Sequence, residues 1–478
     1  MLHNSLKILK INRIVKMLTC HFSHKIKDKK CQINSKIQQS LVRKLLKNCA
    51  KAIDFIKNII SNKEFIEKHK NNPSDFTRNR SLPFSTVFLF LINLLKSSIQ
   101  NELDKFFQVI SKSDTPIQTV TASAFCQARK KLKHTAFVEL IHKISCYFYK
   151  SFEIKNWRGF RLVAVDGSTV QVPKNKETEK YFGSWHPAKS TDSCPMARVS
   201  QMFDVLNHIN LDAVIAPKSN GERTLAAQHF QHLSKYDLVL LDRGYPAFWL
   251  FRLILSKGGQ FCARLPIELW KSVLQAFITS NLKEQVIALE PNYLQKRECL
   301  NQNLPTTPLK VRLLKIELDT GETEILITSL IDCIIYPYEN FQELYFKRWP
   351  VEEHYKLIKS RVEIANFTGK SVQAIKQDFY ARIFMCNLTS ILAFAVHDKI
   401  DEKHKESKLQ YKINWTQALA KMKNSAILLF FRENVLGIII ELLNLFLANN
   451  SAIRPGRKFP RKKQFNSKKF YFAYKPIS

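Results

Sequence analysis

The sequence predicts an α/β core that contains a β-rich insertion and is flanked by helical N- and C-terminal regions. The first observation is a pair of short apolar runs, residues 162–165 and 238–241, each followed directly by an aspartate. These runs lie in a region where strand-like and helix-like patterns alternate along the chain. The second is the strand-like alternation within residues 266–334. The third is the helical spacing of apolar residues before position 156 and after position 400.

Charge is the most unusual property of this 478-residue chain, which is long enough for about two to four domains. Its 75 Lys and Arg exceed its 40 Asp and Glu by 35, and the isoelectric point is about 9.8. Such an excess predicts a polyanionic partner, and since no uncharged apolar run reaches 18 residues, we expect no membrane. The ten cysteines include no C-x-x-C pair and no export signal is visible, so we expect a cytoplasmic protein with reduced thiols.

Residues 1–75 are the first predicted region, a basic and mostly helical extension with 17 Lys and Arg against 5 Asp and Glu. A helix over residues 41–60 has lysines between its apolar positions, which fits a solvated helix and a DNA-contacting arm equally well. Two cysteines and two histidines lie close together, but their spacing fits no common zinc site: Cys20, His21, His24 and Cys31. Ordinary reduced cysteines are therefore the favoured interpretation there.

Residues 76–155 are predicted to form a helical DNA-binding region. Thr121 and Ser123 are candidate caps of a short helix that carries basic residues at its end. Two short helices with a basic second one suggest helix-turn-helix-like binding, although basic surface helices are common without DNA. The residues expected to contact DNA here are Arg129, Lys130 and Lys131.

Residues 156–265 are predicted to form the first part of the core. We expect a strand that ends at Asp166 and a second short strand after it, then a hairpin turned at residues 207–210. The next strand ends at Asp242. One aspartate in such a place is often only a turn cap, but the ends of strands are also where α/β sheets place their chemistry.

Residues 266–334 are the predicted β-rich insertion, with a Thr320-Gly321 turn signal, and residues 335–400 complete the core with a helix that carries Glu352. Four polar residues fall at offsets 0, +3, +7 and +14, a stripe roughly 60° wide on one helix: Tyr345, Arg348, Glu352 and Lys359. Pro350 favours a helix that begins there, with Tyr345 and Arg348 before it. Carboxylates from three separate elements suit an oxygen-ligated divalent cation.

The last predicted region, residues 401–478, is helical and ends in a basic tail. Residues 454–478 hold nine Lys and Arg and no acidic residue, with interleaved aromatic residues. This one-sided composition predicts contact with phosphate.

The spaced residues also carry a resemblance. The pattern Y-x2-R-x3-E-x6-K from Tyr345 to Lys359 resembles the signature of bacterial insertion-sequence transposases of the D-D-E type with the Y-R-E-K signature. Two aspartate regions of that family are similar to VDGS at Asp166 and LDRGY at Asp242. Its N-terminal helical region is similar to the segments FTRNRSLPF and SAFCQARKKL. The resemblance implies an RNase H-like core, with a mixed sheet, flanking helices and a β-rich insertion before the glutamate. It also implies DNA transposition.

By this resemblance, Asp166, Asp242 and Glu352 are the expected catalytic residues and the ligands of two Mg²⁺ ions, for which Mn²⁺ can substitute. Hydrolysis at the ends of the element would free a 3′-OH that attacks target DNA. The expected partner is double-stranded DNA, as terminal inverted repeats and as target, with a dimer of the chain on the paired ends.

We call the segment from Tyr345 to Lys359 the organising stretch. Four of its residues are expected to contact DNA: Tyr345, Arg348, Trp349 and Lys359. Arg348 suits a bidentate phosphate clamp, and Lys359 a point-charge contact. Trp349 fits a stack on a displaced base or packing on the core. Two alternatives stay open at this stage, a catalytically inactive DNA-binding relative and a metal-dependent nuclease of another lineage.

Overall fold

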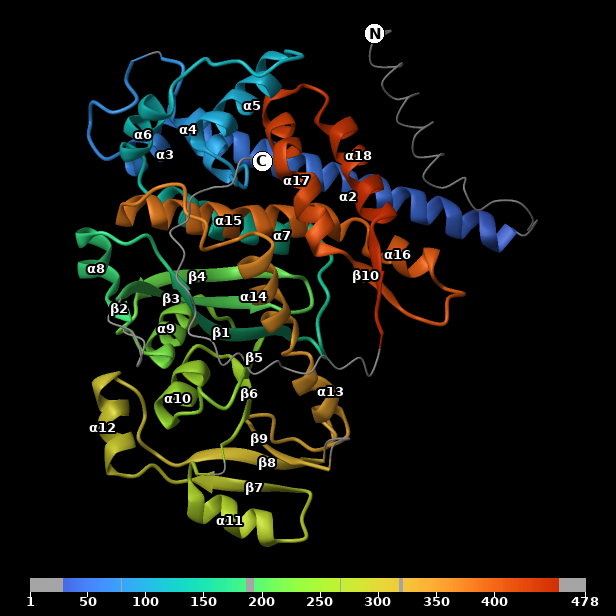
Figure 1. Cartoon of the computed structure of the whole chain (residues 1–478). Coiled ribbons are helices and arrows are strands. Elements are labelled where there is room, and N and C mark those ends of the chain that lie inside the picture. The colour runs from blue at the N-terminus through green and yellow to red at the C-terminus, as the bar shows by residue number, and fades with distance from the viewer. Residues whose placement is uncertain (1–28, 79, 186–192, 267, 318–320, 455–478) are drawn as a thin grey trace.

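The computed structural model describes residues 29–78, 80–185, 193–266, 268–317 and 321–454. Several expectations fall outside this range: the pair of histidines beside Cys20, the turn residue Thr320 and the basic tail after residue 454. Figure 1 shows a central sheet with a helical layer above it and an extension of the same sheet below.

The core is a mixed sheet with flanking helices, as predicted. Its centre has the strand order β4-β3-β1-β5-β6, in which β1, β5 and β6 are parallel to one another and β3 is antiparallel to both of its neighbours. This arrangement fits an RNase H-like core. The strands are β1 Arg161–Gln171, β2 Ser184–Trp185, β3 Cys194–Asp204, β4 Ile209–Pro217, β5 Asp237–Leu241 and β6 Gln260–Arg264. The predicted hairpin between β3 and β4 is confirmed.

The first strand differs from the prediction of two short strands, because β1 runs without a break through Asp166. Its pairing with β5 ends at Ala164, which lies opposite Leu240, while its pairing with β3 continues as far as Gln171. Residues after Asp166 therefore stay extended because a long antiparallel partner remains beside them. Asp166 still lies beyond the end of the parallel pairing.

The segment predicted as an insertion adds three strands to the same sheet. β9 pairs with β6, β8 pairs with β9, and β7 pairs with β8, all antiparallel. The elements are α11 Lys271–Thr279, β7 Glu284–Leu289, α12 Tyr293–Asn301, β8 Leu309–Glu317 and β9 Thr323–Thr328. The sheet is thereby lengthened on the side away from the helical layer (Figure 1).

Helices pack on the sheet and carry parts of the site. Helices α7 and α15 lie side by side over β4, and α14 packs against β1 (Figure 1). α15 is buried along nearly its whole length, polar residues included, so it forms the centre of the molecule. The helices around the core are α7 Thr135–Ser151, α8 Lys176–Phe182, α9 Glu222–His229, α10 Phe248–Ser256, α13 Asn340–Phe346, α14 Pro350–Ser360 and α15 Val372–Phe394, with a 3-10 turn at Phe230–His232.

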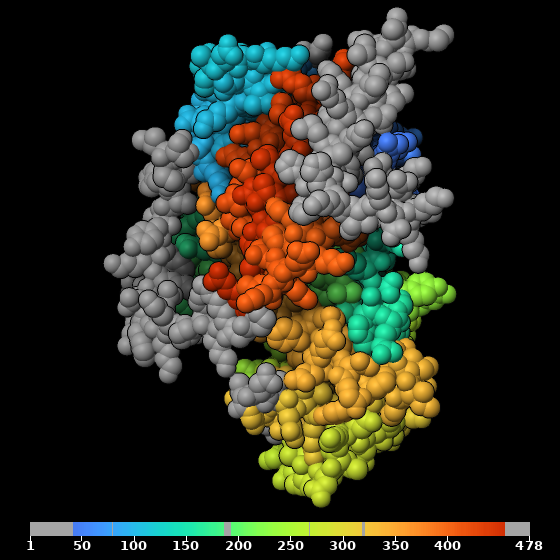
Figure 2. All heavy atoms as spheres, turned by 90° about the vertical axis from the view of Figure 1, so that its right-hand side faces the viewer, coloured from blue at the N-terminus to red at the C-terminus, as the bar shows by residue number. Residues whose placement is uncertain are grey.

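The helices before and after the core pack on each other. α17 contacts α5 and α18 contacts α2, and Figure 2 shows the orange and red C-terminal segments lying against the cyan N-terminal ones. Thr121 caps α6 as predicted, accepting a hydrogen bond from the Ala124 N–H. The elements are α2 Lys29–Ser61, α3 Lys63–His69, α4 Phe84–Ile92, α5 Ile99–Ser111, α6 Ala122–Lys130, α16 His397–Lys403, β10 Tyr411–Ile413, α17 Trp415–Phe431, α18 Val435–Ala448 and β11 Asn450–Ala452.

None of the described helices is by itself long and apolar enough to cross a bilayer. Only α15 and α16 taken together, across a bend of 49°, reach that length and composition.

Candidate active site

The two predicted aspartates occupy matching positions on neighbouring parallel strands. Ala164 of β1 lies opposite Leu240 of β5, and Asp166 and Asp242 each follow two residues later. Side chains two residues apart along a strand point to the same face, so continuing this register places both carboxylates side by side on one face. The Tyr345 hydroxyl lies 3.4 Å from Asp242 Oδ1 and 3.5 Å from the Leu241 carbonyl oxygen, and it donates toward both.

Helix α14 brings Glu352 to this end of the sheet. It begins at Pro350, which confirms the predicted start, and Glu352 lies in its first turn. Trp349 before it is in the αR region, although a following proline disfavours this. One turn after Glu352, the Tyr355 hydroxyl donates to the Asp166 carbonyl oxygen at 2.9 Å, which fixes α14 on β1.

The three carboxylates share one electrostatic environment. Burial raises the pKa of Asp166 to about 6. The Gly167 N–H, which donates to Asp166 Oδ1 at 2.8 Å, and the Arg348 guanidinium lower that pKa, while the charges of Glu352 and Asp242 raise it. Like charges held this close are costly unless a cation lies among them, and carboxylate oxygens are the ligands of hard divalent cations.

Within the part of the chain that the structure describes, the donor atoms of the three carboxylates do not all lie within 4.8 Å of one another. Arg348 explains the position of Glu352, because its Nη2 donates to Glu352 Oε1 at 2.6 Å. Burial lowers the pKa of Arg348, but the Tyr345 hydroxyl and the Glu352 carboxylate outweigh it, so the guanidinium stays charged. The contact with Arg348 involves Oε1 of Glu352 and not its second carboxylate oxygen, Oε2.

Two further polar groups line the site, and neither was predicted. A Cβ added to Gly167 would lie 3.3 Å from the Tyr245 hydroxyl and 3.4 Å from Cγ of Glu222, so the glycine of VDGS allows a close approach. Tyr245 is buried, and its hydroxyl has no hydrogen-bond partner among the described residues. Glu222 pairs with Arg198 at 2.9 Å. Tyr245 belongs to the LDRGY block and could have been singled out, whereas Glu222 carries no sequence signal.

The burial of Asp166 predicts a pH-dependent cost to folding. Because its pKa is raised from 3.8 to about 6, charging it destabilises the native state above pH 6, and the cost disappears as the pH falls toward 4. Asp166→Asn should therefore stabilise the metal-free protein at pH 8 by on the order of 3 kcal/mol, and have little effect at pH 4. Urea denaturation in chelator at both pH values measures this. An equal effect at both would contradict it.

Of the four predicted DNA contacts in the organising stretch, two face into the site and two are exposed to solvent. The Tyr345 hydroxyl contacts Asp242 and Arg348 Nη2 contacts Glu352, while Arg348 Nε is buried without a hydrogen-bond partner among the described residues. They lie on α13 and in the turn after it, so the four-residue stripe does not belong to one continuous helix. Lys359 is exposed and donates to the Ser168 hydroxyl of β1, and the exposed Trp349 lies 5.3 Å from Lys356 Nζ.

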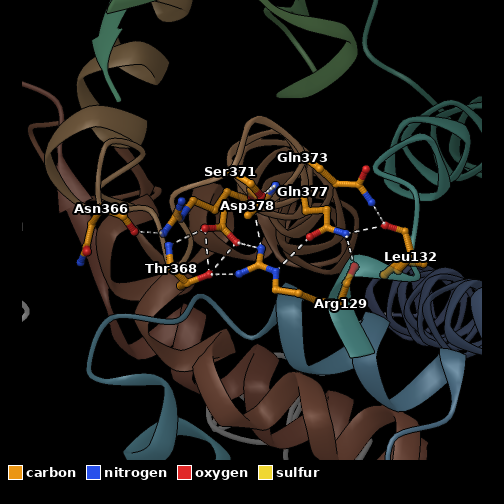
Figure 3. Close-up of polar contacts among 10 residues, drawn as sticks. Arg129, Leu132, Asn366, Thr368, Ser371, Gln373, Gln377 and Asp378 are labelled. Carbon is orange, nitrogen blue, oxygen red and sulfur yellow. Dashed lines mark hydrogen bonds and ion pairs between the residues drawn. The ribbon is translucent and has the colours of Figure 1, made fainter. Parts of the chain in front are cut away.

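Arg129 is not at the surface, which overturns the expectation that it contacts DNA. It is 4% exposed, and Figure 3 shows its guanidinium enclosed between α6 and α15. Its Nη2 pairs with Asp378 Oδ1 at 2.9 Å, its Nη1 donates to the Thr368 hydroxyl at 2.7 Å, and its Nε donates to Gln377 Oε1 at 3.0 Å. Arg129 is therefore not available to DNA, because all three of its guanidinium nitrogens are bonded to groups inside the protein. Lys130 is exposed and Lys131 half-buried.

Comparisons with known proteins point to one family. Residues 157–388 match the family described as Transposase DDE domain, a span that contains both aspartates and Glu352. "Transposase InsG for insertion sequence element IS4" of Escherichia coli (strain K12) is 21% identical over 318 residues, which cover 65% of this chain and 70% of that protein. "Putative transposase InsZ" of the same organism is 27% identical over 173 residues, 34% of this chain and 55% of that protein.

Among solved structures, a cryo-EM structure of a piggyBac transposase synaptic complex with hairpin DNA is similar at a TM-score of 0.40. It is 10% identical in sequence, and the match covers 81% of this chain and 85% of that one.

Proposed function

The chain is a bacterial insertion-sequence transposase with a DDE domain, and from this premise we propose that it cleaves DNA at the ends of its element and joins the freed 3′-OH ends to target DNA. The observation that carries the proposal is the matched position of Asp166 and Asp242 beyond the last β1–β5 pair, with the charges of both Glu352 and Asp242 acting on Asp166. The three carboxylates come from a strand, the end of a second strand and a helix that packs on the first.

In this proposal, Asp166, Asp242 and Glu352 would hold two Mg²⁺ ions, with Mn²⁺ able to replace them. When bound, such ions lower the pKa of an attacking water and stabilise the leaving oxygen of a phosphodiester. The protein's own part is to position the ligands. Tyr345 orients Asp242, and Arg348 orients Glu352.

DNA is the proposed partner, as terminal inverted repeats and as target, with two copies of the chain on paired ends. The net charge of +35 supports contact with a polyanion. Of the four predicted DNA contacts in the organising stretch, Lys359 and Trp349 are exposed, so they are the proposed phosphate and base contacts there. Lys130 and Lys131 keep their proposed role, whereas Arg129 does not.

A cleavage assay tests this function. Its substrate is a DNA duplex that carries the sequence flanking the coding region, incubated with the full chain and Mg²⁺ or Mn²⁺. Nicking that leaves a 3′-OH, followed by joining to a second duplex, is the expected result. Retardation of the duplex without nicking would instead indicate a DNA-binding relative without activity, and cutting without joining would indicate a nuclease.

A further inference from the structure

Histidines from two helical segments surround one aspartate at the edge of the core sheet. His142 comes from α7, Asp212 from β4, His229 from the end of α9, and His232 from the 3-10 turn that follows. We call these four residues the histidine cluster. Two of its members come from α7 and β4, which pack against each other. None of the four belongs to the carboxylate site, and the proposed function uses none of them.

Three members of the cluster have the geometry of a metal site. The donor atoms of His142, Asp212 and His232 all lie within 4.8 Å of one another, and no other group of three such residues in the described chain does so. His142 Nε2 is 3.0 Å from Asp212 Oδ1, and His232 Nε2 is 3.9 Å from Asp212 Oδ2. Ligands around a tetrahedral Zn²⁺ are about 3.3 Å apart, so small movements of these side chains suffice to bind one.

A hydrogen-bonded network alone does not account for His232. His142 and His229 each form a good hydrogen bond to the Asp212 carboxylate, at 3.0 and 2.7 Å. His232 is too far from the carboxylate for one, yet its ring centroid lies 4.5 Å from that of His142. Nε2 of His232 lies 3.4 Å from the Gln231 amide nitrogen, a long contact, and 3.9 Å from Asp212 Oδ2.

The fourth member supports the other three from behind. His229 is fully buried, and its Nδ1 lies 2.7 Å from Asp212 Oδ2 while its Nε2 lies 2.9 Å from the Ser200 hydroxyl. Metal-binding carboxylates and histidines are usually oriented by such outer contacts. Ser200 belongs to β3 and lies opposite Gly167 of β1, so the support extends to the strand that carries Asp166.

We propose that His142, Asp212 and His232 bind one transition-metal ion of the Zn²⁺ class, at a site separate from the carboxylates. Imidazole nitrogens favour such ions over Mg²⁺, which prefers oxygen ligands. The two histidines are 30% and 32% exposed, so an ion can enter from solvent and keep a water as its fourth ligand. The ion would tie α7, and with it the N-terminal helices, to the edge of the core sheet.

Cobalt binding to the full chain tests this site, because four-coordinate Co²⁺ absorbs visible light and substitutes for Zn²⁺. Protein stripped with chelator is titrated with CoCl₂, and wild type is compared with His142→Asn and His232→Asn. Each variant should lose the visible bands and bind one equivalent less than wild type. The comparison uses the difference in bound cobalt between wild type and each variant. Cobalt bound by other cysteines and histidines, such as Cys20 and His21, cancels in this difference because those residues are the same in every protein.

Three further variants make the result specific. His404→Asn removes a half-buried histidine outside the cluster and should bind cobalt as wild type does. Asp166→Asn alters the carboxylate site, which can itself take up cobalt through oxygen ligands, so its expected result is that the visible bands of the histidine cluster stay unchanged. His229→Gln should keep the stoichiometry but weaken affinity roughly 10- to 100-fold. Melting in chelator establishes that the asparagine variants fold. Unchanged bands in both His142→Asn and His232→Asn, or their loss in Asp166→Asn, would overturn the proposal.

Discussion

Replacing any of the three carboxylates, as Asp166→Asn, Asp242→Asn or Glu352→Gln, should reduce DNA cleavage by about 10³-fold or more. Each change removes a proposed ligand of the ions that stabilise the leaving oxygen, a contribution of several kcal/mol to the transition state. Binding of the DNA ends should remain, because it depends on basic residues elsewhere. Nicking of an end-labelled duplex measures the first effect, and a gel-shift titration of the same duplex measures the second.

Glu353→Gln is the matched control for the helix. It makes the same chemical change one position further along α14, but Glu353 is exposed and pairs with Lys412 at 3.0 Å, outside the site. It should cleave DNA as wild type does. Near-normal nicking by one of the three site variants would remove that residue from the proposed set of ligands.

The second large effect concerns stability. Arg129→Ala should lower the free energy of unfolding by about 3–5 kcal/mol, because it leaves the carboxylate of Asp378, 3% exposed, buried without its partner. The same change also leaves the Thr368 hydroxyl and the Gln377 amide oxygen without their donor. Urea denaturation followed by circular dichroism measures the loss.

The exposed neighbour provides the control for this prediction. Lys130→Ala removes a positive charge one residue away and should change stability by no more than about 0.5 kcal/mol. The double change Arg129→Met with Asp378→Leu should recover part of the stability lost in Arg129→Ala, since the carboxylate left unpaired by Arg129→Ala is then absent. The recovery is partial because the buried Arg382 loses the nearby charge of Asp378. An Arg129→Ala protein as stable as Lys130→Ala would show that the pair does not hold α6 against α15.

Local patterns predicted much of the fold and of the carboxylate site. The apolar runs before Asp166 and Asp242 form the parallel pair β1 and β5, and Pro350 begins the helix that carries Glu352. These features depend on neighbouring residues, through strand propensity and the fixed φ of proline. The break predicted after Asp166 was wrong because the extended chain there is held by β3, a partner about 30 residues away that composition does not reveal.

The parts that were missed depend on contacts between distant residues. Arg129 reads as one of a run of surface cations, and only the fold brings Asp378 to it across 249 positions. The contacts of Tyr345 with Asp242 and of Arg348 with Glu352 were not predicted, because they depend on how α13 and the turn after it pack against the sheet. The histidine cluster has no motif, since His142 and His232 are 90 positions apart and meet only through Asp212.

The most direct test of the proposed active site is the position of manganese in crystals of the full chain grown with MnCl₂ and DNA ends. Anomalous scattering locates the ions independently of any assumption about their ligands. We predict anomalous peaks among the carboxylates of Asp166, Asp242 and Glu352, with Glu352 offering the oxygen that Arg348 does not hold. Well-ordered carboxylates with no peak among them, beside manganese bound elsewhere, would contradict the account.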